Sequence, residues 1–193
     1  MDYTPIYNRY NGELRPLISE FEGREEQFEE PILENMAYLV DELSLCVQSE
    51  DLADQKNHFK TAQQNLEEAV TNTYKYLVVS HHKQLIKFKR RFSKHQLESY
   101  NNGKFIGKFN ADTEKAIGCT RQARKQINLL DAKDDFKQAY ELYSNIEHDI
   151  SDFESEGAAL KSHAKGVFWT IVKMVLSVAG SVVVAYFFTN CPL

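Results

Sequence analysis

The sequence predicts an all-α protein: an elongated antiparallel helical bundle or coiled coil of about three long helices, with a C-terminal transmembrane helix. Three observations support this prediction. Apolar side chains recur at helical spacings of three and four residues along most of the chain. Glycine and proline, which interrupt helices, number only 8 and 4 among 193 residues. Near its end the chain carries an apolar run long enough to cross a bilayer.

Residues 1–16 are expected to form an irregular N-terminal arm. Pro5, Pro16 and the pair of Asn11 and Gly12 are all residue types that favour turns. The arm is also rich in tyrosine, which would pack it against the helices that follow.

Residues 17–165 are expected to form one cytosolic helical domain. Its first helix covers residues 17–49, and Pro31 should kink or divide it, because proline lacks the amide proton and clashes with the preceding turn. The second helix starts between residues 49 and 52 and ends before Asn101, where two asparagines and a glycine follow one another.

The third helix begins after a loop at residues 100–110 and has the most regular apolar row in the chain. From Leu129 to Val167 apolar or small residues recur in alternating steps of three and four, which is the heptad pattern of a coiled coil. The row leads directly into the apolar run, so one continuous helix is expected to extend from the loop into the membrane. Gly157 is its expected weak point.

Residues 166–188 are predicted to span the membrane once. The apolar part would reach about 33 Å as a helix, against about 30 Å for the hydrocarbon core of a bilayer. Basic residues precede the span, and no lysine or arginine follows it in the short tail of residues 189–193. The positive-inside rule therefore places the N-terminal domain in the cytosol and the C-terminus on the far side, which is the layout of a tail-anchored protein.

Small residues within the span are predicted to let spanning helices associate. Ser177, Ser181 and Ala185 recur at every fourth residue, with Gly180 beside them. Alternatively, they only reflect how common small residues are in such helices. Lys173, the one charge in the span, either snorkels to the cytosolic interface or faces a polar pore inside an oligomer. Ion flux through liposomes that depends on Lys173 would distinguish these two roles.

Charge is segregated along the chain. Residues 13–54 hold thirteen acidic and two basic side chains, whereas residues 69–126 hold thirteen lysines or arginines and three acids. The two stretches either lie side by side and neutralise each other, or the basic stretch binds an acidic protein or RNA at the distal tip of the rod. The centre of the basic patch consists of Lys83, Lys87, Lys89, Arg90, Arg91 and Lys94.

Arg90 and His95 are separated as R-x4-H, in the segment RRFSKH. This spacing resembles the short motif of HEPN ribonucleases, helical proteins in which an arginine and a histidine from paired subunits act on an RNA phosphate. An arginine can stabilise phosphate charge and a histidine can transfer a proton, so the residue types suit that reaction. The polar residue that usually follows the arginine is here Arg91.

Other catalytic or cofactor signatures are not found in the sequence. It contains no Cys-x2-Cys pair, no phosphate-binding glycine loop and no Glu-x2-His pair of the di-iron kind. No metal or cofactor is therefore expected.

The sequence favours a non-enzymatic protein that is held in a bilayer and forms homo-oligomers, acting as a membrane scaffold or as a membrane-permeabilising effector. The alternative is a membrane-tethered protein that binds RNA or cleaves it as HEPN ribonucleases do. An RNA cleavage assay with Arg90 and His95 replaced would separate the two.

Overall fold

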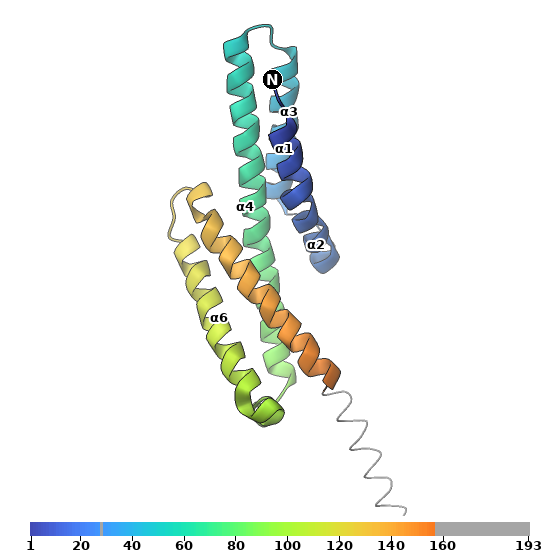
Figure 1. Ribbon diagram of the computed structural model, residues 1–193, viewed down its shortest axis with the longest axis vertical. Coiled ribbons are helices and arrows are strands. Elements are labelled where there is room, and N and C mark those ends of the chain that lie inside the picture. Colours follow the sequence, from blue (N-terminus) through green and yellow to red (C-terminus); the bar gives the residue numbers. More distant parts are fainter. Residues whose placement is uncertain (28, 157–193) are drawn as a thin grey trace, which may run out of the picture. The chain divides into compact units, whose positions relative to one another are not determined.

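The computed structural model describes residues 1–27 and 29–156 (Figure 1). Every regular element in these ranges is helical, which confirms the predicted all-α class. None of their helices is both long enough and apolar enough to cross a membrane. The predicted span lies outside the described residues, together with Lys173, Ser177, Gly180, Ser181 and Ala185.

Residues 1–149 form one compact unit, and a second unit starts at residue 150. The first unit is the one described below. Its central element is α4 (Leu52–Arg91), a helix of 40 residues that reaches about 60 Å by helical rise. Asp51 begins it by accepting a hydrogen bond from the backbone amide of Ala53.

The N-terminal segment is helical, so the prediction of an irregular arm is wrong. It consists of α1 (Thr4–Arg9) and a π-helical turn, η1 (Tyr10–Leu14). Pro5 lies in the first turn of α1 and Pro16 in the first turn of α2 (Arg15–Glu25). A proline in that position needs no amide partner and has the right φ angle, so both prolines start helices here. Ile6 and Leu14 are buried and hold the segment to the core.

The expected division of the first long helix at Pro31 is confirmed. The helix α2 ends at Glu25, and Glu26 closes it in a left-handed conformation with φ of 56°. The next helix, α3 (Glu30–Gln48), has Pro31 in its first turn. It runs alongside the first half of α4, and the two are joined by a short connection (Figure 1).

The second predicted helix ends earlier than expected, at Arg91. Phe92 is extended, and Ser93 then forms a capping box with Gln96 that starts the short helix α5 (Lys94–Ser99). The predicted loop at residues 100–110 shrinks to the turn η2 (Tyr100–Gly103), in which both asparagines are left-handed. The following helix, α6 (Lys104–Ala123), is therefore already formed by residue 104.

The predicted continuous third helix is also interrupted. After α6 the chain turns and passes through η3 (Leu130–Ala132), and a new helix covers residues 133–156, of which residues 133–149 belong to the first unit. The regular apolar row marks the buried face of this new helix, because Phe136, Ala139, Tyr143 and Ile146 are all at most 3% exposed. The apolar row fades upstream of Leu129, and at this point the predicted third helix is broken by the turn that joins α6 to η3.

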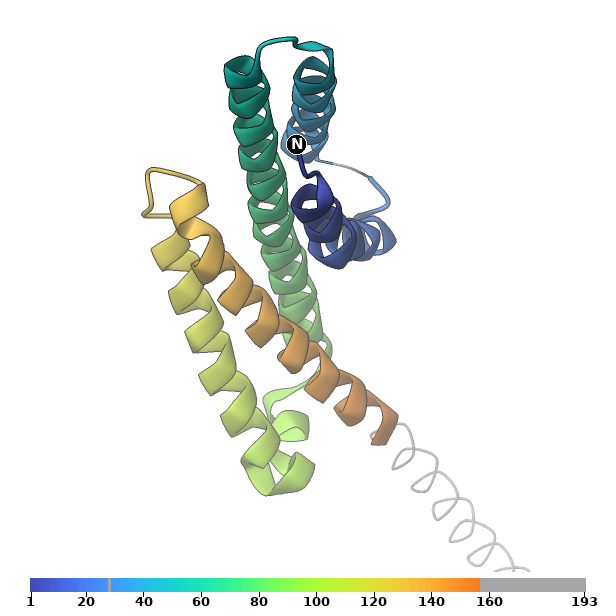
Figure 2. The ribbon, with the colours of Figure 1, turned by 45° about the horizontal axis from the view of Figure 1, so that its top comes forward.

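The helices α1, α2 and α3 cover the first half of α4, and α6 with the helix of residues 133–149 covers its second half (Figures 1 and 2). Around the first half, Phe21, Leu66 and Leu77 belong to one apolar core. Around the second half, the ring of Phe88 packs against that of Phe109, with 5.7 Å between centroids. Of the three long helices predicted, α4 comes nearest to its expected bounds among the described residues, although it ends before α5 begins.

Candidate functional site

A network of charged and aromatic side chains joins α2, α4 and the helix of residues 133–149. Arg24 donates two hydrogen bonds to Glu147, of 2.8 and 2.7 Å, and one of 2.9 Å to Glu20. His81, which is fully buried, places Nδ1 2.7 Å from Glu147 and Nε2 3.4 Å from Glu20. Tyr140 donates to the other oxygen of Glu20 at 2.5 Å. These five residues are called the His81 network below.

The charges of the His81 network hold one another in the ionised state. The close approach of His81 is the main cause that lowers the pKa of Glu20 to about 2, and the hydrogen bond from Tyr140 and the charge of Arg24 lower it further. Burial alone would raise the pKa of Glu147 and lower that of His81, but their contact with each other and with the opposite charges around them reverses both shifts. While His81 is protonated, two carboxylates therefore face one guanidinium and one imidazolium, and the network has no net charge. Its role is to join three helices.

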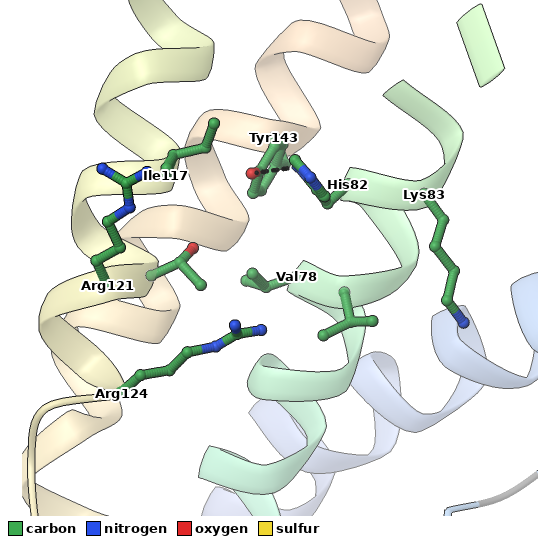
Figure 3. Close-up of a pocket in the computed structure, with 9 residues that line it drawn as sticks. Val78, His82, Lys83, Ile117, Arg121, Arg124 and Tyr143 are labelled. Carbon is green, nitrogen blue, oxygen red and sulfur yellow. Dashed lines mark hydrogen bonds between the residues drawn. The ribbon is translucent and has the colours of Figure 1, made fainter. Parts of the chain in front are cut away.

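A cavity of about 320 Å³ lies beside the network, between α4, α6 and the helix of residues 133–149 (Figure 3). Tyr143 connects the two, because its ring stacks on that of His81 with 6.3 Å between centroids and also lines the cavity. The helix α4 contributes Val78, Val79, His82 and Lys83 to the cavity, and the α6 side contributes Ile117, Thr120, Arg121 and Arg124.

The cavity has an apolar interior and a cationic mouth. Val78 is 2% exposed, whereas Arg121 and Arg124 are exposed and therefore stand where the cavity opens to solvent. Figure 3 shows Arg124 extending from α6 toward Val78. It also shows the ammonium group of Lys83 turned away from the cavity, and that group lies 3.8 Å from Glu25. The charge at the mouth therefore comes from the two arginines.

His82 and Tyr143 add hydrogen-bonding groups to the cavity wall. The Tyr143 hydroxyl lies 3.0 Å from Nδ1 of His82. Burial lowers the pKa of His82, and the nearby charges of Lys89 and Arg124 lower it further. Burial raises the pKa of Tyr143 to about 12. Near neutral pH a neutral imidazole and a neutral hydroxyl therefore share this hydrogen bond, and its direction is set by the tautomer of His82.

Neither arginine at the mouth has an acidic partner within the part of the chain that the structure describes. Arg9 and Arg24, by contrast, each hold a carboxylate with two hydrogen bonds. The chain has more acidic than basic residues, with 28 Asp and Glu against 23 Lys and Arg, so the lack of partners at Arg121 and Arg124 does not follow from a shortage of acids. The cavity mouth is therefore a place of uncompensated positive charge.

The predicted basic patch occupies the last turns of α4, and Lys94 starts α5. The prediction that it pairs with the acidic first helix is confirmed for Lys83, which reaches Glu25. Lys89 instead stands over the ring of Phe109 at 5.0 Å. Among the described residues, Lys87 and Arg90 have no carboxylate within ion-pair distance. The patch is therefore only partly neutralised by its own unit.

Arg90 and His95 lie on opposite sides of the break at Phe92 and Ser93. Arg90 is in the last turn of α4, and His95 is in the first turn of α5. Both are exposed, and no hydrogen bond between them is found in the described structure. The resemblance to HEPN ribonucleases implies a site shared by two subunits, so this arrangement in one chain does not test it.

The cavity was missed at the level of sequence. Its signal there is weak: two arginines three residues apart, hence on one face of a helix, one turn after Ile117. Adjacent residues of a helix point in different directions, and accordingly the imidazole of His81 belongs to the network and that of His82 to the cavity.

Within residues 1–27 and 29–156 no three His, Cys, Asp or Glu side chains lie close enough to hold a metal ion. No protein-family model matches the chain, and no curated protein or solved structure shows significant similarity to it. A function for this chain must therefore be argued from its own surfaces.

Proposed function

We propose that the chain is a tail-anchored, single-pass membrane protein whose cytosolic helical domain self-associates and acts as a membrane scaffold. The anchor is supported by the apolar sequence of residues 166–188, which lies outside the described residues. Self-association is supported by one observation in the described unit, an exposed apolar stripe on α3.

The stripe runs along the face of α3 that its own unit leaves uncovered. Leu33, Val40 and Val47 are 48%, 63% and 71% exposed, and they follow one another at intervals of seven residues. Ala37 and Ser44, which are also exposed, fill the positions between them. Alternating steps of four and three make this row a coiled-coil seam without its partner helix. Exposed apolar surface of this kind marks a site of protein association.

Charge indicates which surface of a second copy fits the stripe. Glu34 and Asp41 border it and are exposed, so two stripes brought together would place acids against acids. The last turns of α4 offer the opposite charge, with Lys87 and Arg90 around Ile86, which is 37% exposed. The favoured contact is therefore head to tail, from the stripe of one copy to the basic face of the next. Such a contact repeats instead of closing into a pair, as a scaffold requires.

This contact predicts that either surface can be inactivated separately. Val40→Glu and the double variant Lys87→Glu/Arg90→Glu should each be monomeric, because each loses one of the two surfaces. Mixed in equal amounts, they should form a dimer of one copy of each, since the mixture retains one intact stripe and one intact basic face. Light scattering after size-exclusion chromatography in a nonionic detergent measures these masses.

Lys104→Glu/Lys125→Glu is the matched control, because it reverses two exposed charges of the same sign away from the patch. It should assemble as the wild type does. A monomeric wild-type protein would reject self-association. Assembly of Lys87→Glu/Arg90→Glu at the wild-type mass would reject the head-to-tail contact.

The anchor predicts that the protein stays with membranes after an alkaline carbonate wash and is released by detergent. In a Cys119→Ser variant, Cys191 should react with a membrane-impermeant maleimide only from the side opposite the cytosol, since Cys46 is buried. Release by the wash without detergent would contradict the anchor, and so would labelling of Cys191 from the cytosolic side.

Membrane permeabilisation is the second candidate function. It rests on Lys173, which shares a helical row with Ser177 and Ser181 in the predicted span. An assembly of spans through that row would bring several lysines together around one axis.

A further inference from the structure

We propose that the cavity between α4, α6 and the helix of residues 133–149 binds a small anion with an apolar or aromatic body. Its phosphate or carboxylate group would lie on Arg121 and Arg124 at the mouth, and its body on Val78, Val79 and Ile117. This site is separate from the stripe and basic face used for self-association, and it does not depend on the membrane anchor.

The size and lining of the cavity select the body of the ligand. At about 320 Å³ it lies at the lower end of the range in which proteins enclose small molecules. Val78, Val79 and Ile117 supply apolar surface from two facing helices (Figure 3). Filling this space with an apolar or planar group removes that surface from water, which favours binding.

The two arginines favour a ligand that carries a phosphate or carboxylate group. Arg121 lies in the last turn of α6 and Arg124 at its C-cap, so the two side chains start from the same face of that helix. In Figure 3 the guanidinium group of Arg124 extends toward Val78, whereas that of Arg121 extends along α6. A guanidinium is a planar fork of donors that matches the two oxygens of a carboxylate or phosphate. Because no described acid neutralises them, an incoming anion displaces only water from these groups. Lys83 does not compete with the two arginines for the anion, since its ammonium group lies beside Glu25.

His82 supplies a further polar group, in a fixed direction. Its Nδ1 is occupied by the Tyr143 hydroxyl at 3.0 Å, which leaves Nε2 to bond a ligand. Tyr143 is itself 2% exposed and its ring packs on that of His81, so this part of the wall is held in place before any ligand arrives. A preorganised polar group costs less entropy on binding than a mobile one.

The first experiment is a calorimetric titration of the full-length protein in nonionic detergent with phenyl phosphate, which combines the anion with a small ring. Inorganic phosphate, which is the anionic group alone, and phenol, which is the ring alone, are titrated separately. Saturable binding of phenyl phosphate at one site is expected, with each half binding at least about tenfold more weakly. Equal affinity for inorganic phosphate and phenyl phosphate would overturn the proposal, because the cavity would then contribute nothing.

The second experiment locates the site. Arg121→Gln/Arg124→Gln should weaken the binding of phenyl phosphate at least about tenfold, since the phosphate would lose its charge-assisted hydrogen bonds from both guanidinium groups. Arg15→Gln/Lys125→Gln removes the same charge from exposed positions outside the cavity and should bind as the wild type does. Equal losses in the two double variants would overturn the proposal in favour of a diffuse cationic surface.

A third variant, Val79→Phe, keeps every charge and fills the apolar space. It should lose the preference for phenyl phosphate over inorganic phosphate while its far-UV circular dichroism stays that of the wild type. An unchanged preference would overturn the placement of the ring in this cavity.

The natural ligand can be a lipid head group or a soluble metabolite. A further titration in lipid bilayers distinguishes these two sources. The protein is titrated with phenyl phosphate in nanodiscs of phosphatidylcholine alone and of phosphatidylcholine with phosphatidic acid. A weaker apparent affinity with phosphatidic acid supports the site as one for lipid head groups. Equal affinities in the two nanodiscs support it as one for a soluble anion, and no binding in either would overturn the proposal.

Discussion

Replacing Glu147 with alanine is expected to lower the free energy of unfolding by about 3 to 5 kcal/mol. Glu147 accepts hydrogen bonds of 2.8 and 2.7 Å from Arg24 and faces Nδ1 of His81 at 2.7 Å. The side chains of Arg24 and His81 are 18% and 0% exposed, so water replaces the lost carboxylate only in part. Glu20 would then be the one carboxylate left in the network beside Arg24 and His81, and removing one partner from a buried ion-pair network in this way is costly.

Thermal unfolding followed by far-UV circular dichroism measures this effect, and two further variants interpret it. Asp149→Asn removes a carboxylate two residues away that binds Lys108, whose side chain is 59% exposed, and should cost at most about 1 kcal/mol. Glu147→Leu/Arg24→Met removes both main charges of the network and should recover part of the loss, because apolar side chains of similar volume tolerate the same site. Equal costs for the Glu147 and Asp149 variants would contradict this account of the network.

The helices themselves follow from local patterns, which is why the sequence predicts most of them. Apolar rows of period three and four mark α3, α4 and the helix of residues 133–149, and Pro31 divides α2 from α3 as expected. The wrong prediction of an irregular N-terminal arm has a local cause. Pro5 and Pro16 suit turns and the first turns of helices equally well, and only burial of Ile6 and Leu14 shows which applies.

The network and the cavity could not be predicted, because they depend on how helices are aligned in space. Arg24 and Glu147 are 123 residues apart in sequence, so nothing local to either indicates the other. Charge counting indicated that acidic and basic stretches would neutralise each other, and this is confirmed at Lys83. It did not show that Arg121 and Arg124 would be left without partners beside an apolar cavity. Segregation of charge along a chain does not determine which individual charges meet.

The protein is expected to be most stable near pH 6.5 and to lose stability on both sides, because His81 and His82 are shifted in opposite directions. The folded state raises the pKa of His81 above its ordinary value of 6.5, so the stability it contributes is complete below pH 6.5 and is lost as the pH rises through the folded pKa. The folded state lowers the pKa of His82, so its contribution is complete above pH 6.5 and is lost as the pH falls through the folded pKa.

Protonation of Glu20 below pH 4.5 should remove a larger contribution to the free energy of unfolding. The pKa of Glu20 is about 2 in the folded state against 4.5 in the unfolded chain, so its stabilisation is present above pH 4.5 and disappears as the pH falls toward 2. At about 1.4 kcal/mol for each unit of difference between the two pKa values, the contribution of Glu20 amounts to about 3 kcal/mol. Lowered pKa values of Glu147 and Glu67 act in the same direction.

Thermal unfolding midpoints measured from pH 4 to pH 9 test the two histidines against each other. His81→Gln should abolish the fall above pH 6.5 and keep the rise below it, even though the midpoint drops at every pH because a buried ion pair is lost. His82→Gln should do the opposite, abolishing the rise between pH 4.5 and pH 6.5 and keeping the fall above it. Each variant is thus the control for the other. A fall above pH 6.5 that persists without His81 would show that its imidazolium does not hold Glu147 and Glu20 together, and the ionised state assigned to the network would have to be abandoned.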